Sequence, residues 1–332
     1  MRRCLAVSLV WLSAAIPAVA QTPPVPADTD QARPVFRSGA ELVALTVAVM
    51  DSGGQRFVRG LSADDFAVYE DGVRQDVSFF AASEVPLDLI LLLDTSASMT
   101  DKLATMHEAA LGFLRTLRPQ DRGAVVGFND GVQVLRGLTG NAEALATAVR
   151  STQAHGATAL NNAIYVAIKE FGRSARQAGN VRRQAIAVLS DGDDTCSLIA
   201  FDDVLKEAKK SGVAIYTISL RGAPVTQRRG TFSTALYSMK TLAQETGAQA
   251  FFPTAIDELS GVYGKIADEL EHQYALGYSP KNPRTDGRYR RVVVQVVSRP
   301  DLRLRTRTGY FAERASASAA SATLPPVVQP RQ

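Results

Sequence analysis

The sequence predicts an α/β protein with a doubly wound, mostly parallel sheet flanked by helices, together with a small antiparallel β-sandwich. Strand-like and helical segments alternate along residues 86–271, and residues 87–93 form an almost unbroken apolar run. Such alternation is typical of a parallel sheet with helices on both faces, and a strand buried on both faces reads as a continuous apolar run. Short strand-like runs at both ends of the folded region predict the sandwich.

The strands and helices of the middle part follow from periodicity and from their stop signals. Helical spacing stops before Pro119, and Asn141 is a favourable first cap for the helix that follows it. We expect strands at 87–93, 124–128, 132–135, 184–189, 213–220 and 249–252, and helices at 99–117, 141–149, 160–171, 201–210, 234–245 and 256–271.

The two segments that flank the middle part, 37–85 and 272–312, are β-like and contain turn sequences such as 70–72 and 285–287. Each has about three strands, which is a marginal number for a sheet that must be stable alone. Together they make about six, enough for a small sandwich. We therefore expect both ends to pack into one domain that carries the middle part as an insertion. The alternative is two separate β extensions.

The ends of the chain are expected to lie outside the fold. Residues 1–20 have a basic start, a short apolar run and a small-x-small site at 18–20, which predicts a signal peptide rather than a buried strand. Residues 21–36 are typical of a linker and 313–332 of a disordered tail. The rest has no run of eighteen apolar residues, so we expect no transmembrane segment in the mature chain. We therefore predict that the protein is exported and is periplasmic or extracellular.

Composition excludes several classes of function. The 332 residues are 46% apolar and 21% charged, as in ordinary globular proteins. Removing Arg2 and Arg3 with the signal peptide lowers the formal charge from +4 to +2, and the basic residues are scattered among acids, so no nucleic-acid partner is expected. Cys196 is then the only cysteine, which rules out an internal disulfide and favours an unpaired, partly buried thiol. The oligomeric state stays open.

Short oxygen-bearing side chains gather in three loops of the expected sheet. The first loop, 94–98, follows the most apolar strand; the second, 156–160, precedes a helix; the third, 190–194, follows another apolar strand. In such sheets, ligands bind where loops leave the carboxyl ends of the strands. The loops contain no cluster of His or Cys, and oxygen ligands suit hard cations: Mg²⁺ first, with Mn²⁺ or Ca²⁺ as alternatives.

These loops resemble those of the von Willebrand factor A family, also called the integrin I-domain family, over residues 86–271. That family's metal-ion-dependent adhesion site combines an Asp-x-Ser-x-Ser loop with a Thr and an Asp from two further loops. Asp94, Ser96 and Ser98 match the first loop, Thr158 the second and Asp191 the third. The motif alone is a weak signal, but all three loops stand at the positions that the fold requires. Ala157 departs from the pattern, since a second Gly is common there.

The resemblance implies a function in binding. It implies that Ser96, Ser98 and Thr158 ligate the metal directly, while Asp94 and Asp191 act partly through water. The metal then stays electrophilic, and an acidic side chain of a partner protein completes its shell. In the family, ligation can be coupled to movement of the last helix, here 256–271.

Nearby polar residues have simpler interpretations than metal binding. We expect His155 to be a solvated loop residue, Asp193 and Asp194 to be solvated acids, and Thr100 and Asp101 to start a helix.

Segments outside the middle part also carry a resemblance. Residues 61–66 and 68–75 resemble the leader of a bacterial subgroup known as the VWFA-related domain, abundant in Acidobacteria, and 307–311 resembles its closing motif.

Three functions remain in view. The first is a metal-dependent adhesion module, and the second is an envelope scaffold or chaperone in which the metal is only structural. The third is a metal-assisted hydrolase, which is disfavoured because common catalytic motifs are missing from the sequence. The sequence has no Gly-x-Ser-x-Gly, no His-Glu-x-x-His and no glycine-rich phosphate loop. We therefore expect no enzymatic activity.

Overall fold

The computed structural model describes residues 42–82, 85–175, 182–191, 193–220 and 234–312. The expected signal peptide and tail lie outside these ranges, as does the linker. Within the described ranges no helix combines the length and apolar character that crossing a bilayer requires.

The middle part forms a six-stranded sheet in the order β10-β9-β8-β5-β6-β7. All neighbours are parallel except β7, which runs antiparallel to β6 at one edge. The strands are β5 (Leu87–Asp94), β6 (Arg122–Phe128), β7 (Val132–Thr139), β8 (Arg183–Ser190), β9 (Ala214–Ser219) and β10 (Ala250–Phe251). The predicted doubly wound, mostly parallel sheet is therefore confirmed.

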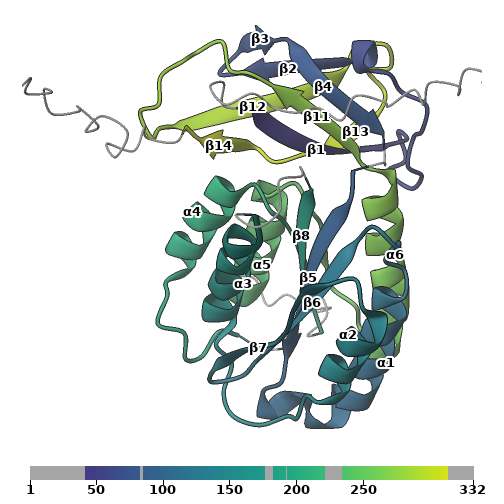
Figure 1. The fold of residues 1–332 in the computed structure, drawn as a ribbon, viewed down its shortest axis with the longest axis vertical. Helices are drawn as coiled ribbons and strands as arrows, with labels where there is room; N and C mark the ends of the chain where they lie inside the picture. The colour runs from purple at the N-terminus through teal and green to yellow at the C-terminus, as the bar shows by residue number, and fades with distance from the viewer. Residues whose placement is uncertain (1–41, 83–84, 176–181, 192, 221–233, 313–332) are drawn as a thin grey trace, which may run out of the picture. The chain divides into compact units, whose positions relative to one another are not determined.

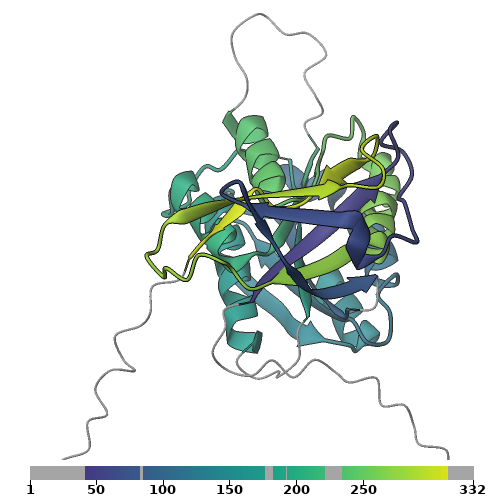
Figure 2. The same cartoon turned by 90° about the horizontal axis from the view of Figure 1, so that it is seen from above.

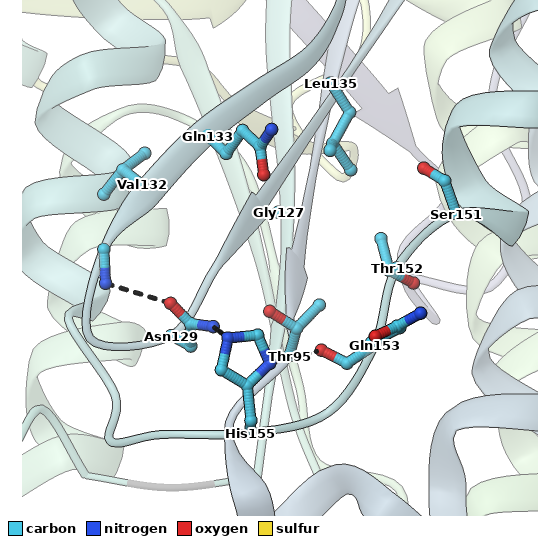
Figure 3. A pocket seen from close by; sticks show the side chains of 11 residues that line it. Thr95, Gly127, Asn129, Val132, Gln133, Leu135, Ser151, Thr152, Gln153 and His155 are labelled. Carbon is cyan, nitrogen blue, oxygen red and sulfur yellow. Dashed lines mark hydrogen bonds between the residues drawn. The ribbon is translucent and has the colours of Figure 1, made fainter.

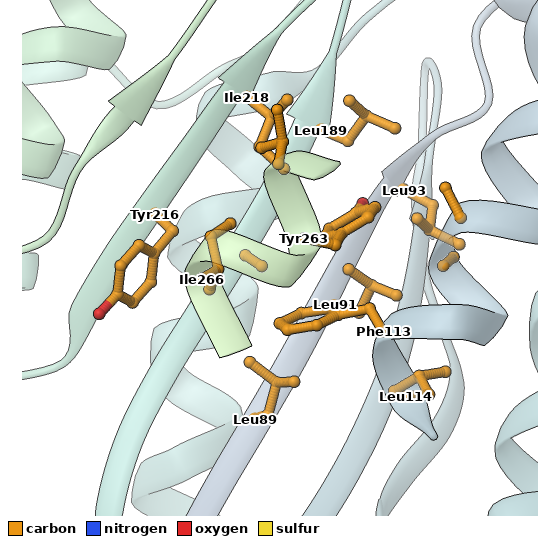
Figure 4. Close-up of a cluster of buried hydrophobic side chains, with 14 of the residues drawn as sticks. Leu89, Leu91, Leu93, Phe113, Leu114, Leu189, Tyr216, Ile218, Tyr263 and Ile266 are labelled. Atoms are coloured by element: carbon orange, nitrogen blue, oxygen red, sulfur yellow. The ribbon is translucent and has the colours of Figure 1, made fainter. Parts of the chain in front are cut away.

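Helices cover both faces of this sheet (Figure 1). One face carries α1 (Leu103–Leu114), α2 (Ala142–Arg150) and α6 (Leu259–His272), and the other carries α3 (Leu160–Ala175), α4 (Phe201–Ser211) and α5 (Thr234–Glu245). The side chains of β5 alternate between the two cores: Leu91 packs with α1 and α6, whereas Leu92 packs with α3 and α4. Figure 4 shows the first core, where the rings of Phe113 and Tyr263 stack with centroids 4.7 Å apart.

Two elements of the middle part differ from expectation. The edge strand β7 runs to Thr139 instead of ending at 135. The helix expected from 99 begins with a 3-10 turn, η2 (Ala97–Lys102), before α1 starts. The Thr100 hydroxyl donates to the carbonyl of Ala97 at 2.7 Å, and such a side-chain bond competes with regular helical hydrogen bonding. The cap at Asn141 is confirmed, because its side chain accepts from the backbone N–H of Ala144 at 3.0 Å.

The two ends of the described chain form two four-stranded antiparallel sheets, ordered β13-β1-β11-β4 and β14-β12-β2-β3. Their strands are β1 (Val43–Met50), β2 (Phe66–Glu70), β3 (Val73–Gln75), β4 (Val77–Ala82), β11 (Tyr274–Tyr278), β12 (Tyr289–Val296), β13 (Arg303–Arg305) and β14 (Gly309–Phe311). Short 3-10 turns, η1 (Ala63–Asp65) and η3 (Ile256–Glu258), precede β2 and α6.

Strands from opposite ends of the chain pair with each other in both sheets, where purple and yellow strands lie side by side in Figure 2. They alternate along the sheet β13-β1-β11-β4, whereas in β14-β12-β2-β3 the two ends meet at β12 and β2. Leu45 of β1 lies opposite Leu276 of β11, and Val68 of β2 lies opposite Val294 of β12. All four side chains belong to one buried core, so the sandwich made from both ends is confirmed. The exact domain boundaries at 85–86 and 271–272 stay a prediction.

The sandwich has more strands than the sequence predicted. The described residues contain eight of them, rather than the expected six or so. Two of the strands, β13 and β14, have only three residues each. Segments this short depend on a partner strand for their hydrogen bonds, which β1 supplies to β13 and β12 supplies to β14.

Candidate metal centre

The three polar loops meet at one end of the six-stranded sheet. Asp94 is the last residue of β5, and Asp191 directly follows the neighbouring strand β8. The two strands are in parallel register, with Leu93 opposite Leu189, so their carboxyl ends lie side by side. The second loop enters α3, whose first residue is Leu160. The expected meeting of the loops follows from this topology.

Asp94 is fully buried and held by two hydrogen bonds. One carboxylate oxygen accepts from the backbone N–H of Ser96 at 2.9 Å, and the other accepts from the Ser190 hydroxyl at 2.6 Å. Burial raises the pKa of Asp94 above its ordinary value, and the hydrogen bond from Ser190 offsets part of that increase. The nearby carboxylate of Asp191 raises this pKa further. The two acids are therefore close enough to repel each other.

A chain of polar contacts joins the other members of the first and third loops. The hydroxyl oxygens of Ser96 and Ser98 lie 3.1 Å apart, and the Ser98 hydroxyl donates to one oxygen of Asp191 at 2.7 Å. The second oxygen of Asp191 forms an ion pair with the ammonium of Lys102. Together with Asp94, the two serines and Asp191 form one cluster.

The loop that carries Thr158 is hydrogen-bonded through its backbone to the first and third loops. Its N–H donates to the hydroxyl of Thr195 at 3.0 Å, and the N–H of Ala97 donates to the carbonyl of Gly156 at 3.0 Å. Gly156 has a φ of +75°, which L side chains rarely adopt, so glycine suits this turn. The buried Thr158 hydroxyl makes no hydrogen bond with a described residue, which leaves its lone pairs available to a ligand.

The donor set fits a hard divalent cation. Carboxylate and hydroxyl oxygens are the ligands that Mg²⁺, Mn²⁺ and Ca²⁺ prefer. Among the described residues, no group of three or more His, Cys, Asp or Glu side chains could hold a metal, so a metal in this cluster would depend on hydroxyl ligands beside its two carboxylates. Two buried acids that repel each other gain most from a cation between them. The cluster therefore has the chemistry of a metal site built on hydroxyls and two carboxylates.

The sequence model of a protein family, the von Willebrand factor type A domain, matches residues 88–264, which is more than half of the chain. The chain belongs to the von Willebrand factor type A (VWA) domain family. VWA domains are commonly protein-interaction modules, and they are generally not enzymes.

Relatives of this VWA protein have little stated function. An uncharacterized protein of Synechocystis sp. is 31% identical over 113 residues, covering 33% of this chain and 26% of its own length. A UPF0353 protein of Mycolicibacterium paratuberculosis is 26% identical over 209 residues, covering 57% of this chain and 62% of its own. This chain thus spans less than two thirds of either relative.

Solved structures similar to this VWA protein include a von Willebrand factor type A protein from Catenulispora acidiphila. It is 12% identical with a TM-score of 0.48, and the match covers 87% of this chain and 78% of that one. The von Willebrand factor domain of a type V pilus tip protein from Porphyromonas gingivalis is 15% identical with a TM-score of 0.43, covering 55% and 94% of the two chains.

Two residues of the VWA cluster were missed by sequence reasoning. Ser190 precedes Asp191 and bonds Asp94, and Lys102 pairs with Asp191. A usable signal existed for Lys102, because it lies four residues after Ser98, the spacing of one helical turn.

Among the nearby polar residues, Asp194 differs from the expectation that it is a solvated acid. It is half-buried, with one oxygen accepting from the Asn161 amide at 3.0 Å and the other buried without a hydrogen-bond partner among the described residues. It is therefore not the solvated acid expected, because the start of α3 packs against its loop. His155 is exposed and Cys196 is unpaired and half-buried, both as expected.

Proposed function

We propose that this chain is an exported, metal-ion-dependent protein-binding module. Asp94, Ser96, Ser98, Thr158 and Asp191 would hold one divalent cation, Mg²⁺ in the first place. An acidic side chain of a partner protein would complete the shell of that cation. The module would act in the periplasm or outside the cell, with residues 1–20 as the signal peptide and 86–271 as the binding domain.

One observation carries the proposal: two buried or nearly buried carboxylates share a cluster with two serine hydroxyls at the carboxyl end of the sheet. Burying two acids side by side is unfavourable unless a positive charge lies near them. Lys102 supplies a single charge to Asp191. A divalent cation would balance both acids.

When bound, the cation would act as a Lewis acid toward an incoming carboxylate. The chain's own residues do the rest. Ser190 and the Ser96 N–H hold both oxygens of Asp94, which fixes the orientation of that carboxylate. Ser98 in turn fixes one oxygen of Asp191. Because two acids at most neutralise a divalent ion, the site retains attraction for a third carboxylate, that of the partner.

The test is a calorimetric titration of Mg²⁺, and then Mn²⁺, into chelator-treated protein comprising residues 21–332. We expect saturable binding at one site, reduced at least tenfold in the Asp94→Ala/Ser96→Ala double variant. Asp301→Ala, an exposed acid outside the cluster, is the matched control and should bind normally.

Absence of metal binding by folded wild-type protein would refute the proposal. The Asp191→Ala variant separates adhesion from the scaffold function: an adhesin would lose its acidic partner together with the metal, whereas a scaffold would keep its partner.

A further inference from the structure

A cavity of about 370 Å³ lies beside the metal cluster, and the proposed function gives it no role. It is bounded by the ends of β5 and β6, the start of β7 and the loop at 151–155 (Figure 3). Cavities of this size are at the lower end of those that bind small ligands. It has room for one amino-acid side chain.

The cavity and the metal cluster share two loops. Thr95 lines the cavity, and its two neighbours in the chain, Asp94 and Ser96, belong to the cluster. His155 also lines the cavity, and its N–H donates to the carbonyl of Thr95 at 2.8 Å. Because consecutive Cα atoms are about 3.8 Å apart, an extended peptide bound at the cluster would bring a residue near its acid to the cavity.

The lining of the cavity combines polar side chains with Val132 and Leu135, and it includes no Asp, Glu, Lys or Arg side chain. Most of the polar groups in the lining already make hydrogen bonds within the protein. The Thr95 hydroxyl donates to the carbonyl of Phe128 at 2.9 Å, and Asn129 donates to the His155 ring at 2.9 Å. Thr152 donates to the carbonyl of Val149 at 3.0 Å. These bonds hold the walls in place.

Two glutamine side chains in the lining are the exception. The amides of Gln133, on β7, and Gln153, on the facing loop, make no hydrogen bond with any described residue. Each amide offers two N–H donors and one carbonyl acceptor. A second amide satisfies that pattern, whereas the lining offers no Asp, Glu, Lys or Arg side chain to pair with a charged group.

We propose that this cavity is a second subsite, which binds an Asn or Gln side chain located within three residues of the partner's metal-bound acid. The inference rests on the proposed function, because it places the amide on the same peptide as the acid. Metal ligation would then supply affinity for any exposed acid, and the amide subsite would select among acidic segments.

The experiment selects binders from a displayed peptide library with one fixed Asp and random flanking residues, using the protein of residues 21–332. Selection runs in parallel with Mg²⁺ and with a chelator. We expect Mg²⁺-dependent peptides enriched in Asn or Gln at one position within three residues of the Asp.

The selected peptide is then synthesised with its amide residue intact or replaced by Ala. Binding is measured against the wild-type protein and the Gln133→Ala/Gln153→Ala double variant. We expect the variant to bind the amide peptide about 5- to 20-fold more weakly, as the loss of one or two hydrogen bonds implies, and to bind the Ala peptide as the wild type does. Gln295→Ala, exposed on β12, is the matched control and should change neither affinity.

The outcomes separate the two proposals. Mg²⁺-dependent peptides without a preferred amide would overturn the subsite and leave the proposed function standing. Amide-rich peptides selected equally with chelator would support the subsite and overturn metal-bridged binding. A selection that yields no binder in either condition would overturn both.

Discussion

At the scale of single residues, Lys102 contributes one positive charge to the candidate metal centre. Its ammonium pairs with one oxygen of Asp191, whose other oxygen accepts from Ser98. The lysine side chain is 35% exposed and the aspartate side chain 4%, so the pair lies at the rim of the cluster. A fixed positive charge there competes with an incoming cation for the same carboxylate.

We therefore expect Lys102→Met to bind Mg²⁺ about three- to tenfold more tightly than the wild type, measured by calorimetry at low salt. The gain is modest because solvent screens a partly exposed lysine. Lys169→Met is the matched control, since Lys169 pairs with Glu207 and has a comparably exposed side chain. Equal or weaker Mg²⁺ binding by Lys102→Met would show that the ammonium does not compete with the cation.

At the scale of elements, Gly247 governs how closely the segment between β13 and β14 approaches the turn between α5 and β10. Its φ is +81°, and a Cβ at this position would overlap the backbone of Thr306 and Arg307. The N–H of Thr308 donates to the carbonyl of Glu245 beside it at 3.4 Å, and the Thr308 hydroxyl donates to the Glu245 carboxylate at 2.7 Å. The two elements meet backbone to backbone.

We expect Gly247→Ala to lower the free energy of unfolding by about 3 kcal/mol, combining positive-φ strain with overpacking. Gly60→Ala is a close control, because Gly60 has the same φ of +81° and open space around it. Its cost should be about 1 kcal/mol, from strain alone. Urea unfolding followed by circular dichroism measures both, and equal losses would mean that the close approach contributes little.

At the scale of the whole molecule, a buried polar network joins the six-stranded part to the sandwich. Glu269 of α6 is 1% exposed and accepts from the Tyr216 hydroxyl at 2.8 Å. Its other oxygen pairs with Arg305 of β13, which also donates to Gln249 at 2.7 Å. Burial raises the pKa of Glu269, and the charge of Arg305 opposes that increase. The end of α6 is thus held by a sandwich strand.

Replacing Glu269 by Gln should leave Arg305 without its charge partner. We expect a loss of about 3 kcal/mol in the free energy of unfolding, at the lower end for buried pairs broken on one side, because the Arg305 side chain is 20% exposed. Asp301→Asn removes a solvent-exposed pair with Arg299 and should cost less than about 0.5 kcal/mol. Because the network joins both parts, the described fold should unfold in one urea transition that Glu269→Gln shifts as a whole. Two separate transitions, only one of them shifted, would contradict this coupling.

The parallel sheet and the position of the polar loops at the carboxyl ends of its strands were predictable from local pattern. The apolar run of β5 requires burial on both faces, and such a strand needs helices on each side. Once that strand is located, the loops that carry Asp94 and Asp191 fall at its end and at the end of its neighbour. Periodicity and chain order are local properties, and they are sufficient to place these loops. The choice of individual site residues within the loops rests on the resemblance to the von Willebrand factor A family.

Only the tertiary structure decided the contacts between distant segments. The pairing of β1 with β13, the position of Lys102 on Asp191 and the cavity beside Thr95 depend on side chains that meet from separate elements. The strands of three residues form because a partner strand supplies their hydrogen bonds. The buried Glu269 of α6 is tolerated because Arg305, on strand β13 of the sandwich, pairs with it. Local pattern thus determined the layers of this protein, whereas long-range packing determined which charges and cavities those layers bring together.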